Sequence, residues 1–451
     1  MSAVHVPGTL ASNAEPVALV QTDDAAVVSP LPGRGGALIL TLPLWRRLTA
    51  FSFLLIAEFF YGWAWNTVDV LRPLFRASLG LTLTQAGSAY SAQGAGALIG
   101  ALSIGQLADR LGKRNMLVVV MGGYGLLLLA GTLVTSYSGL LLQRFVLGLF
   151  LGGSFPVVVG IYVELFRPTL RGKLASAINA TFSGAIITLG IAFGHLGRHH
   201  WHTLLWVGGM PPVLLAGLAY LVIPTSERVA KSGPGKLPIA ELFTPTLRRQ
   251  TLLLASMTGL NFFAYQAFSG WLTTYLLNVK HLPKQDVGHL VAAQFAGNIL
   301  GGFFWGGVSD RFGRRTGAIG FFITACSIVA YLSVPGNQMV MIALGNLYGF
   351  ALSASVIWGP WLAELYPPHL KSTASSIFNW GRLVSFFSPL ITGAIAEHFG
   401  LRAGMLVSSL VFALAACIWL RLPETLRERR SVRSVAVARG KLFGSGNTSS
   451  G

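Results

Sequence analysis

Charged residues are scarce in this chain. Asp, Glu, Lys and Arg make up 11% of its 451 residues, whereas a soluble domain carries about 25%, so a soluble globular fold is excluded. Acidic residues are the scarcest, with 15 Asp and Glu against 33 Lys and Arg. The two cysteines, Cys326 and Cys417, both fall in apolar runs, which argues against a disulfide framework. The G-x-x-x-x-G-K-[ST] loop is also missing, so nothing supports chemistry driven by ATP.

Long hydrophobic runs are abundant. Hydrophobic residues make up 53% of the chain, and about 20 consecutive apolar residues are enough for one helix to cross a bilayer. We therefore expect an all-α membrane protein with twelve transmembrane helices, because a membrane barrel would show shorter, alternating segments. Such helices use almost the whole chain, which leaves no room for a soluble catalytic domain and argues against an enzyme. The expected spans are residues 48–70, 84–106, 115–135, 138–162, 172–194, 203–223, 251–277, 286–307, 316–334, 338–361, 371–396 and 402–421.

The basic residues gather in alternate connections between these runs. The net charge of +18 therefore marks one side of a membrane and does not indicate nucleic-acid binding. The more basic connections face the cytoplasm in membrane proteins, which puts both termini of this chain inside. The connections expected inside carry Arg110, Lys113, Arg114, Arg167, Arg171, Lys173, Arg228, Lys231, Lys236, Arg248, Arg249, Arg311, Arg314 and Arg315. Those expected outside carry Arg72, Arg76, Arg198, Lys280, Lys284 and Arg402.

The chain contains an internal repeat with an offset of about 200 residues. GQLADRLGKR at 105–114 matches GGVSDRFGRR at 306–315, ELFRPTLR at 164–171 matches ELYPPHLK at 364–371, and IPTSER at 223–228 matches LPETLRER at 422–429. We infer two six-helix bundles related by a pseudo-twofold axis, with a binding site between them near the middle of the bilayer. The predicted units are a disordered cytoplasmic tail at 1–45, the bundles at 46–225 and 250–425, a cytoplasmic linker at 226–249 and a cytoplasmic tail at 426–451.

The repeated loop resembles the G-x-x-x-D-R-x-G-[RK]-[RK] motif of the major facilitator superfamily, and it occurs here after the second and the eighth helix. The resemblance implies a secondary transporter of the cell inner membrane that works as a monomer, without a cofactor, by alternating access. It also implies that residues of these loops, with the acids of the second repeat pair and the arginine that opens the fourth helix, serve as gating residues. These are Asp109, Arg110, Arg114, Asp310, Arg311, Arg315, Glu164, Glu364 and Arg144. For Arg144, a simple anchor at the membrane interface is the alternative.

Three segments narrow the resemblance to the proton symporters of organic anions, which carry aromatic acids, sialate or monocarboxylates. They are QRFVLGLFLGGSFPVVVGIYVELFRPTLRG at 143–172, GWLTTYL at 270–276 and FNWGRLVSFFSP at 378–389. The aromatic-acid group usually carries D-G-[FY]-D in the first helix, and this chain has Tyr61, Gly62, Trp63 and Ala64 there. Both acids are missing, so another residue must take the proton.

Glu58 and Asp69 are the candidates for proton coupling. A charge near the middle of a bilayer costs about 2.5–3.5 kcal/mol on insertion scales and is seldom kept without a function. Glu58 lies about ten residues into the first helix, one turn before Tyr61 and Gly62 on a similar face. Asp69 lies near the outer end of the same helix, where water is closer. The alternative for Glu58 is a structural ion pair within the first bundle. With one deep acid, we predict one proton per monoanion.

Arg382 is the predicted ligand of the substrate anion. It lies about ten residues into the eleventh helix, it keeps its charge at any accessible pH, and its planar fork matches a carboxylate. The alternative is a simple pair with an acid. Further substrate contacts are expected from polar and aromatic residues inside the helices, although such residues also serve helix packing. They are Tyr265, Gln266, Gln294, Asn379, Asn66, Gln93, Asn298 and Trp358.

No metal site is expected. The histidines at 195, 199, 200 and 202 have a spacing that could hold a metal, but a wet loop at the membrane surface explains them better. The expected partners are a small organic anion, protons and the lipid bilayer. Two alternatives for the function remain open at this point. One is a proton symporter of a neutral sugar, suggested by PTSER and PETLR at the ends of the two bundles, and the other is an exporter of a drug or metabolite.

Overall fold

The protein is all helical over the residues that the computed structural model describes, which are 42–196, 201–225, 239–367, 370, 374 and 377–425. The predicted N-terminal tail to residue 41, most of the linker (226–238) and the C-terminal tail lie outside these residues. The first bundle contains α2 (Leu44–Val70), α3 (Arg72–Ser78), α4 (Leu83–Leu111), α5 (Lys113–Ala130), α6 (Tyr137–Leu165), α7 (Pro168–Leu196) and α8 (His202–Val222). The second contains α9 (Arg248–Phe268), α10 (Leu272–Asn278), α11 (Lys284–Phe312), α12 (Gly317–Ser333), α13 (Gln338–Leu352), α14 (Trp358–Leu365), α16 (Ile377–Phe399) and α17 (Leu401–Arg421).

Each predicted span has its helix, but two spans are broken. Between α9 and α10 the chain forms the 3-10 turn η3 (Ser269–Trp271), and between α13 and α14 it forms η5 (Ser353–Ile357). Periodicity of apolar residues does not distinguish a straight helix from one with a short 3-10 segment, so the sequence predicted both spans as continuous. The first helix also begins at Leu44, four residues before the predicted start.

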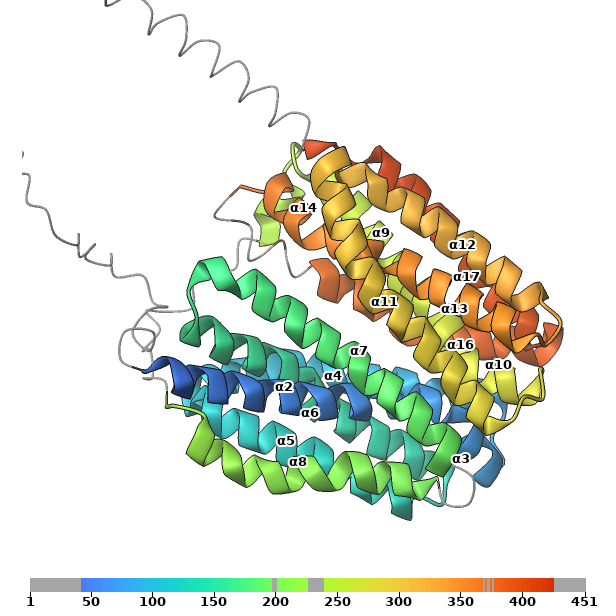
Figure 1. Ribbon diagram of the computed structural model, residues 1–451, viewed down its shortest axis with the longest axis horizontal. Helices are drawn as coiled ribbons and strands as arrows, with labels where there is room; N and C mark the ends of the chain where they lie inside the picture. Colours follow the sequence, from blue (N-terminus) through green and yellow to red (C-terminus); the bar gives the residue numbers. More distant parts are fainter. Residues whose placement is uncertain are drawn as a thin grey trace, which may run out of the picture.

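The helices form two bundles that lie against each other, one from each half of the chain (Figure 1). α4 packs on α16, and α7 packs on α11, so two helix pairs hold the bundles together. The α7–α11 contact is close enough that a Cβ atom placed on Gly288 would lie 2.3 Å from the carbonyl oxygen of Gly190. Only glycine permits this approach of the two backbones.

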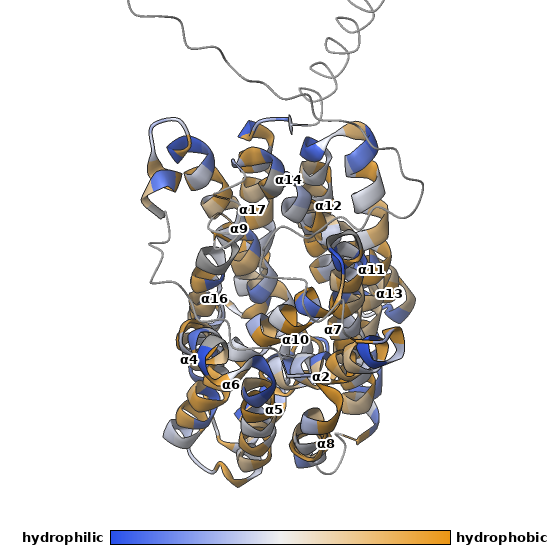
Figure 2. Cartoon of the chain, turned by 90° about the vertical axis from the view of Figure 1, so that its left-hand side faces the viewer, coloured by the Kyte–Doolittle hydropathy of each residue, from blue (hydrophilic) through white to orange (hydrophobic). Residues whose placement is uncertain are grey.

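Nine helices in the described ranges are long and apolar enough to cross a membrane. The remaining long helices are α4, α9 and α16, and they pack in series, α4 on α16 and α16 on α9. A helix that faces protein on several sides needs less apolar surface than one that faces lipid, which explains their lower hydropathy. Figure 2 shows the helices as a whole largely in the hydrophobic colour, with hydrophilic segments at the end beside α14.

Candidate functional site

The structure brings the predicted proton carrier close to the predicted anion ligand. Glu58 lies in α2 and is 2% exposed. Arg382 comes from α16 in the other bundle, and its positive charge acts on the side chains of Glu58 and Tyr61. One oxygen of Glu58, Oε2, is buried without a hydrogen-bond partner among the described residues. A buried carboxylate that lacks a full set of partners is costly, so this site is suited to a change of protonation.

Arg382 is exposed, although its helix is packed between α4 and α9. Its guanidinium lies 5.6 Å from the centre of the Phe262 ring. Within the described part of the chain no carboxylate lies within ion-pair distance of it. An accessible guanidinium beside an aromatic ring can bind a planar carboxylate and its apolar body together.

Tyr90 links this pair of residues to the contact between the bundles. Its hydroxyl, from α4, lies close enough to Ser385 and Arg382 of α16 to interact with both. The Ser385 hydroxyl in turn donates to the carbonyl oxygen of Arg382 at 2.6 Å. A side chain of the first bundle therefore lies beside Ser385 and Arg382 of the second.

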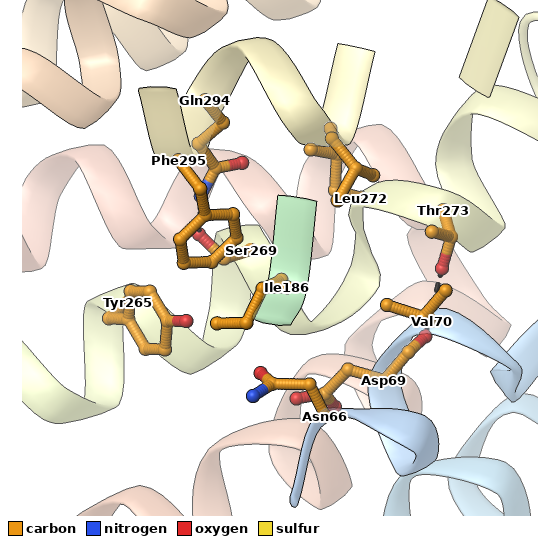
Figure 3. Close-up of a pocket in the computed structure, with 11 residues that line it drawn as sticks. Asn66, Asp69, Val70, Ile186, Tyr265, Ser269, Leu272, Thr273, Gln294 and Phe295 are labelled. Atoms are coloured by element: carbon orange, nitrogen blue, oxygen red, sulfur yellow. Dashed lines mark hydrogen bonds between the residues drawn. The ribbon is translucent and has the colours of Figure 1, made fainter. Parts of the chain in front are cut away.

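A small cavity of about 20 Å³ lies between the bundles, beside the end of α2. Figure 3 shows Asn66 and Asp69 from the first bundle facing Tyr265 and Ser269 from the second. Gln294 donates to the Ser269 hydroxyl at 2.6 Å. This volume holds about one water molecule, so the cavity does not admit an organic acid in this conformation. Its lining consists of Asn66, Asp69, Val70, Ile186, Tyr265, Ser269, Leu272, Thr273, Val291, Gln294 and Phe295.

Asp69 makes polar contacts with both bundles at this cavity. Its Oδ1 accepts a hydrogen bond from Gln266 at 2.7 Å and forms an ion pair with Arg72 at 2.6 Å. Gln266, predicted to bind substrate, thus contacts Asp69 in this state. Arg72 is fully buried, whereas the sequence placed it among the basic residues of the outer loops. Its spacing of three residues from Asp69 on a helical path is the signal that could have identified the pair.

Among the described side chains, Gln93, Asn298 and Trp358 do not line this cavity. Gln93 donates to the carbonyl oxygen of Trp65 at 3.0 Å, inside the first bundle. Asn298 donates to the carbonyl oxygen of Gly349 at 3.5 Å. Trp358 packs on Phe262, with ring centres 6.3 Å apart. Asn379 belongs to α16, but its side chain lies outside the described part. Their roles in substrate binding stay predictions.

Arg144, one of the predicted gating residues, is 2% exposed within the first bundle. It donates to the Thr67 hydroxyl at 3.0 Å. Its charge interacts with those of Asp69 and Arg72. Two guanidinium groups and one carboxylate therefore share this buried region, which makes its charge balance sensitive to any change at Asp69.

The repeated loops form equivalent ion pairs at the opposite end of the molecule. Lys113 pairs with Glu164 in the first bundle, and Arg314 pairs with Glu364 at 2.8 Å in the second. The neighbours Arg114 and Arg315, which the sequence singled out, contact main-chain oxygens of Tyr220 and Leu422 instead. The remaining predicted gating residues are Asp310, which binds Arg314 at 2.7 Å, the exposed Arg110 and Arg311, and Asp109, whose side chain lies outside the described part.

The described residues contain no group of three or more His, Cys, Asp or Glu side chains that could hold a metal. Of the predicted histidine cluster, His199 and His200 lie outside the described residues. The ring of His195 lies 6.3 Å from that of His289 in the other bundle, and the ring of His202 stacks on Trp201.

Comparison with known proteins agrees with this architecture. The model of the family described as Major Facilitator Superfamily matches residues 54–288 and 280–446. A probable 4-methylmuconolactone transporter of Cupriavidus pinatubonensis is 28% identical over 81% of this chain and 89% of its own. The 3-(3-hydroxy-phenyl)propionate transporter of Escherichia coli is 27% identical over 68% of this chain and 77% of its own. Among solved structures, an inward-facing bacterial homologue of the human lysosomal transporter Spinster is 15% identical, has a TM-score of 0.69, and aligns over 84% of this chain and 97% of its own.

Proposed function

The chain belongs to the Major Facilitator Superfamily, and from this premise we propose that it takes up a small organic acid, most simply an aromatic one, together with a proton. It is a secondary transporter, not an enzyme. Its relatives support the substrate class, because they are named as transporters of 4-methylmuconolactone and of 3-(3-hydroxy-phenyl)propionate.

The single observation that carries the proposal is the placement of Arg382 opposite Glu58. The guanidinium supplies the positive charge that a carboxylate substrate needs, and the Phe262 ring beside it supplies an apolar surface for the body of an acid. A neutral sugar offers no negative charge to pair with the guanidinium of Arg382, whereas the carboxylate of an acid does. The aromatic acid is therefore favoured over the sugar.

Glu58 is proposed as the residue that takes the proton. In its neutral form it leaves Arg382 free for the substrate anion, and in its charged form it competes with that anion for the same guanidinium. Substrate and proton then bind together and leave together. One proton with one monoanion moves no net charge, so accumulation follows the pH gradient at about 1.36 kcal/mol per pH unit. Asp69 is the second candidate for the proton.

We further propose that the protein works as a monomer in the cell inner membrane with both termini in the cytoplasm. The paired Lys113–Glu164 and Arg314–Glu364 loops then face the cytoplasm, and the Asp69 end faces outward. The hydrogen bonds between bundles at the Asp69 end and the exposure of Arg382 support a conformation that is closed to the outside. Alternating access requires a second state in which these contacts are broken.

The test is uptake into proteoliposomes with an imposed inward proton gradient. A labelled panel of a benzoate-type acid, a short monocarboxylate, a sialic acid and a hexose distinguishes the substrate classes. We expect an acid to accumulate, Arg382→Ala to abolish its binding, and Glu58→Gln to retain exchange while losing dependence on the gradient. Arg402→Ala and Glu397→Gln are the matched controls, because both replace exposed residues outside the site.

Three outcomes would contradict the proposal. If only the hexose moves, the protein is a sugar symporter. If the acid moves but neither Arg382→Ala nor Glu58→Gln changes its transport, the assigned residues are wrong. If the acid leaves loaded vesicles against its gradient while uptake is not driven, the protein is an exporter.

A further inference from the structure

We propose that Asp69 and Arg72 are positioning residues of the outer gate, and that together with Gln266, Gly270 and Thr273 they form one latch that holds the bundles closed on that side. The name "outer latch" is used below for these five residues. None of its contacts depends on which substrate is carried, so the proposal goes beyond the proposed function.

The latch joins two interrupted helices. In the first bundle, α2 ends at Val70 and α3 starts at Arg72 with a proline in its first turn. In the second, α9 gives way to the 3-10 turn η3 before α10 starts. Where regular helical bonding stops, main-chain carbonyl groups become free to accept other hydrogen bonds. The carbonyl of Gly270 in η3 uses this freedom, because it accepts a hydrogen bond from Nη1 of Arg72.

Four further contacts cross or support the same junction. Gln266 donates to Oδ1 of Asp69 at 2.7 Å, and the Thr273 hydroxyl donates to the main-chain oxygen of Asp69 at 2.8 Å. The Arg72 guanidinium lies 4.5 Å from the ring centre of Trp271. Its Nη2 holds Asp69 within the first bundle at 2.6 Å. Each group is thus oriented by another member of the latch.

Burial makes these contacts strong and selective for the closed state. Arg72 is 0% exposed and Gln266 is 1% exposed, so water does not compete with either. Hydrogen bonds that involve a charged group are roughly twice as strong as neutral ones. Opening this end would leave the Asp69–Arg72 pair in the first bundle and remove its partners in the second. The latch therefore stabilises one of the two states that alternating access requires.

Gly270 is where the latch is tightest. A Cβ atom added there would lie 2.3 Å from Nε2 of Gln266 and 3.3 Å from Oδ1 of Asp69. Even alanine at this position must displace the Gln266 amide from the carboxylate. Gly270→Ala therefore weakens the latch without altering either charged residue.

The experiment measures how fast a buried cysteine reacts with a membrane-impermeant thiol reagent. In a background with Cys326→Ser and Cys417→Ser, which removes both native cysteines, Val291→Cys places the reporter in the wall of the small cavity beside the latch. Asp69→Asn, Gln266→Leu and Gly270→Ala are each expected to raise labelling from the outer side about tenfold, the shift that loss of one charge-assisted hydrogen bond produces. Gln266→Leu leaves the ion pair intact, so its folding is secure even if Asp69→Asn folds poorly.

Glu397→Gln is the matched control. Glu397 also accepts a hydrogen bond across the bundles, from the main-chain nitrogen of Thr84 at 2.9 Å, but this contact is exposed to solvent. The substitution removes the charge of this exposed contact but keeps an oxygen acceptor, as Asp69→Asn does, and it should leave the labelling rate unchanged. The double variant Gly270→Ala/Gln266→Leu should react no faster than Gln266→Leu alone, because both substitutions remove the contact between the Gln266 amide and Asp69.

Several results would overturn the latch. Unchanged labelling in all three variants would show that these contacts do not hold the bundles, and equal acceleration by Glu397→Gln would show that any contact at this end has the same effect. If labelling became faster only from the cytoplasmic side of the membrane, the latch would not close the outer side. Labelling needs neither substrate nor a proton gradient, so failure here is distinct from failure of the proposed symport.

Discussion

The carboxylate of Glu364 and the guanidinium of Arg314 form an ion pair at 2.8 Å, with a second contact at 3.2 Å. Both belong to the second copy of the repeat, and they correspond in position to Glu164 and Lys113 in the first. In both copies a basic residue of the repeated loop therefore pairs with a glutamate near the end of a later helix, α6 in the first bundle and α14 in the second. The basic residue is Lys in one copy and Arg in the other. Arg offers a planar fork and Lys a single ammonium group, so Arg314 contacts both carboxylate oxygens of Glu364.

Glu364→Gln should destabilise the protein much more than Asp310→Asn. Both acids bind Arg314, but the side chain of Glu364 is 10% exposed and that of Asp310 is 72% exposed. Removal of one partner from a buried pair costs about 3–5 kcal/mol, whereas an exposed pair contributes about 0–1 kcal/mol. Thermal unfolding of the purified protein in detergent measures both effects. Equal losses would show that burial does not set the strength of these contacts.

Exchanging the charges of Lys113 and Glu164 should restore the transport activity that reversing either charge alone removes. Lys113→Glu places two acids together and should lower transport, while Lys113→Glu/Glu164→Lys recreates the pair with its sides reversed. Arg114→Glu is the control, because Arg114 contacts Tyr220 and not Glu164. The measurement is the transport rate of each variant in proteoliposomes. If Glu164→Lys also rescued Arg114→Glu, the specific pairing of Lys113 with Glu164 would be contradicted.

Gly87→Ala should open the outer end, whereas Gly105→Ala on the same helix should not. A Cβ atom on Gly87 would lie 2.3 Å from the carbonyl oxygen of Pro389 in α16, but one on Gly105 would have no neighbour within 4 Å. Alanine also favours a helix by up to about 1 kcal/mol over glycine, so Gly105→Ala should be neutral or stabilising. Labelling of Val291→Cys gives the measurement, and identical rates in the two variants would show that α4 and α16 separate without cost.

The sequence predicted the helices, the repeat and the charged ends because these depend on local composition and spacing. Apolar runs of about 20 residues specify a membrane helix regardless of its neighbours, and the repeated loops are visible at a fixed offset. The 3-10 turn at Ser269–Trp271 was missed, since the periodicity of apolar residues does not distinguish it from a regular helix. The same holds for Arg72, which a rule based on loop charge places in water and which the structure buries beside Trp271.

Residues inside the bundles were harder to assign than those at the ends. Glu58 and Arg382 stood out because charge in a membrane is rare, and the structure does bring them together across the bundles. Amides carry no such signal. Gln266 and Gln93 have the same chemistry and similar depth, yet one contacts Asp69 across the interface and the other binds Trp65 within its own bundle. Only the three-dimensional arrangement separates these two environments.

Arg382→Lys should separate the charge of this residue from its shape. Lysine keeps a positive charge near Glu58, so uptake should remain dependent on the proton gradient. It lacks the planar fork that binds both oxygens of a carboxylate, so the apparent affinity for the acid should fall about tenfold, which corresponds to about 1.4 kcal/mol. Arg382→Gln should lose both affinity and accumulation, because it removes the charge as well. Exchange and gradient-driven uptake, measured over a range of acid concentrations, distinguish the two variants. If Arg382→Lys matched Arg382→Gln in both assays, charge alone would not explain the role of this residue, and if it matched the wild type, the two-point contact with the carboxylate would be excluded.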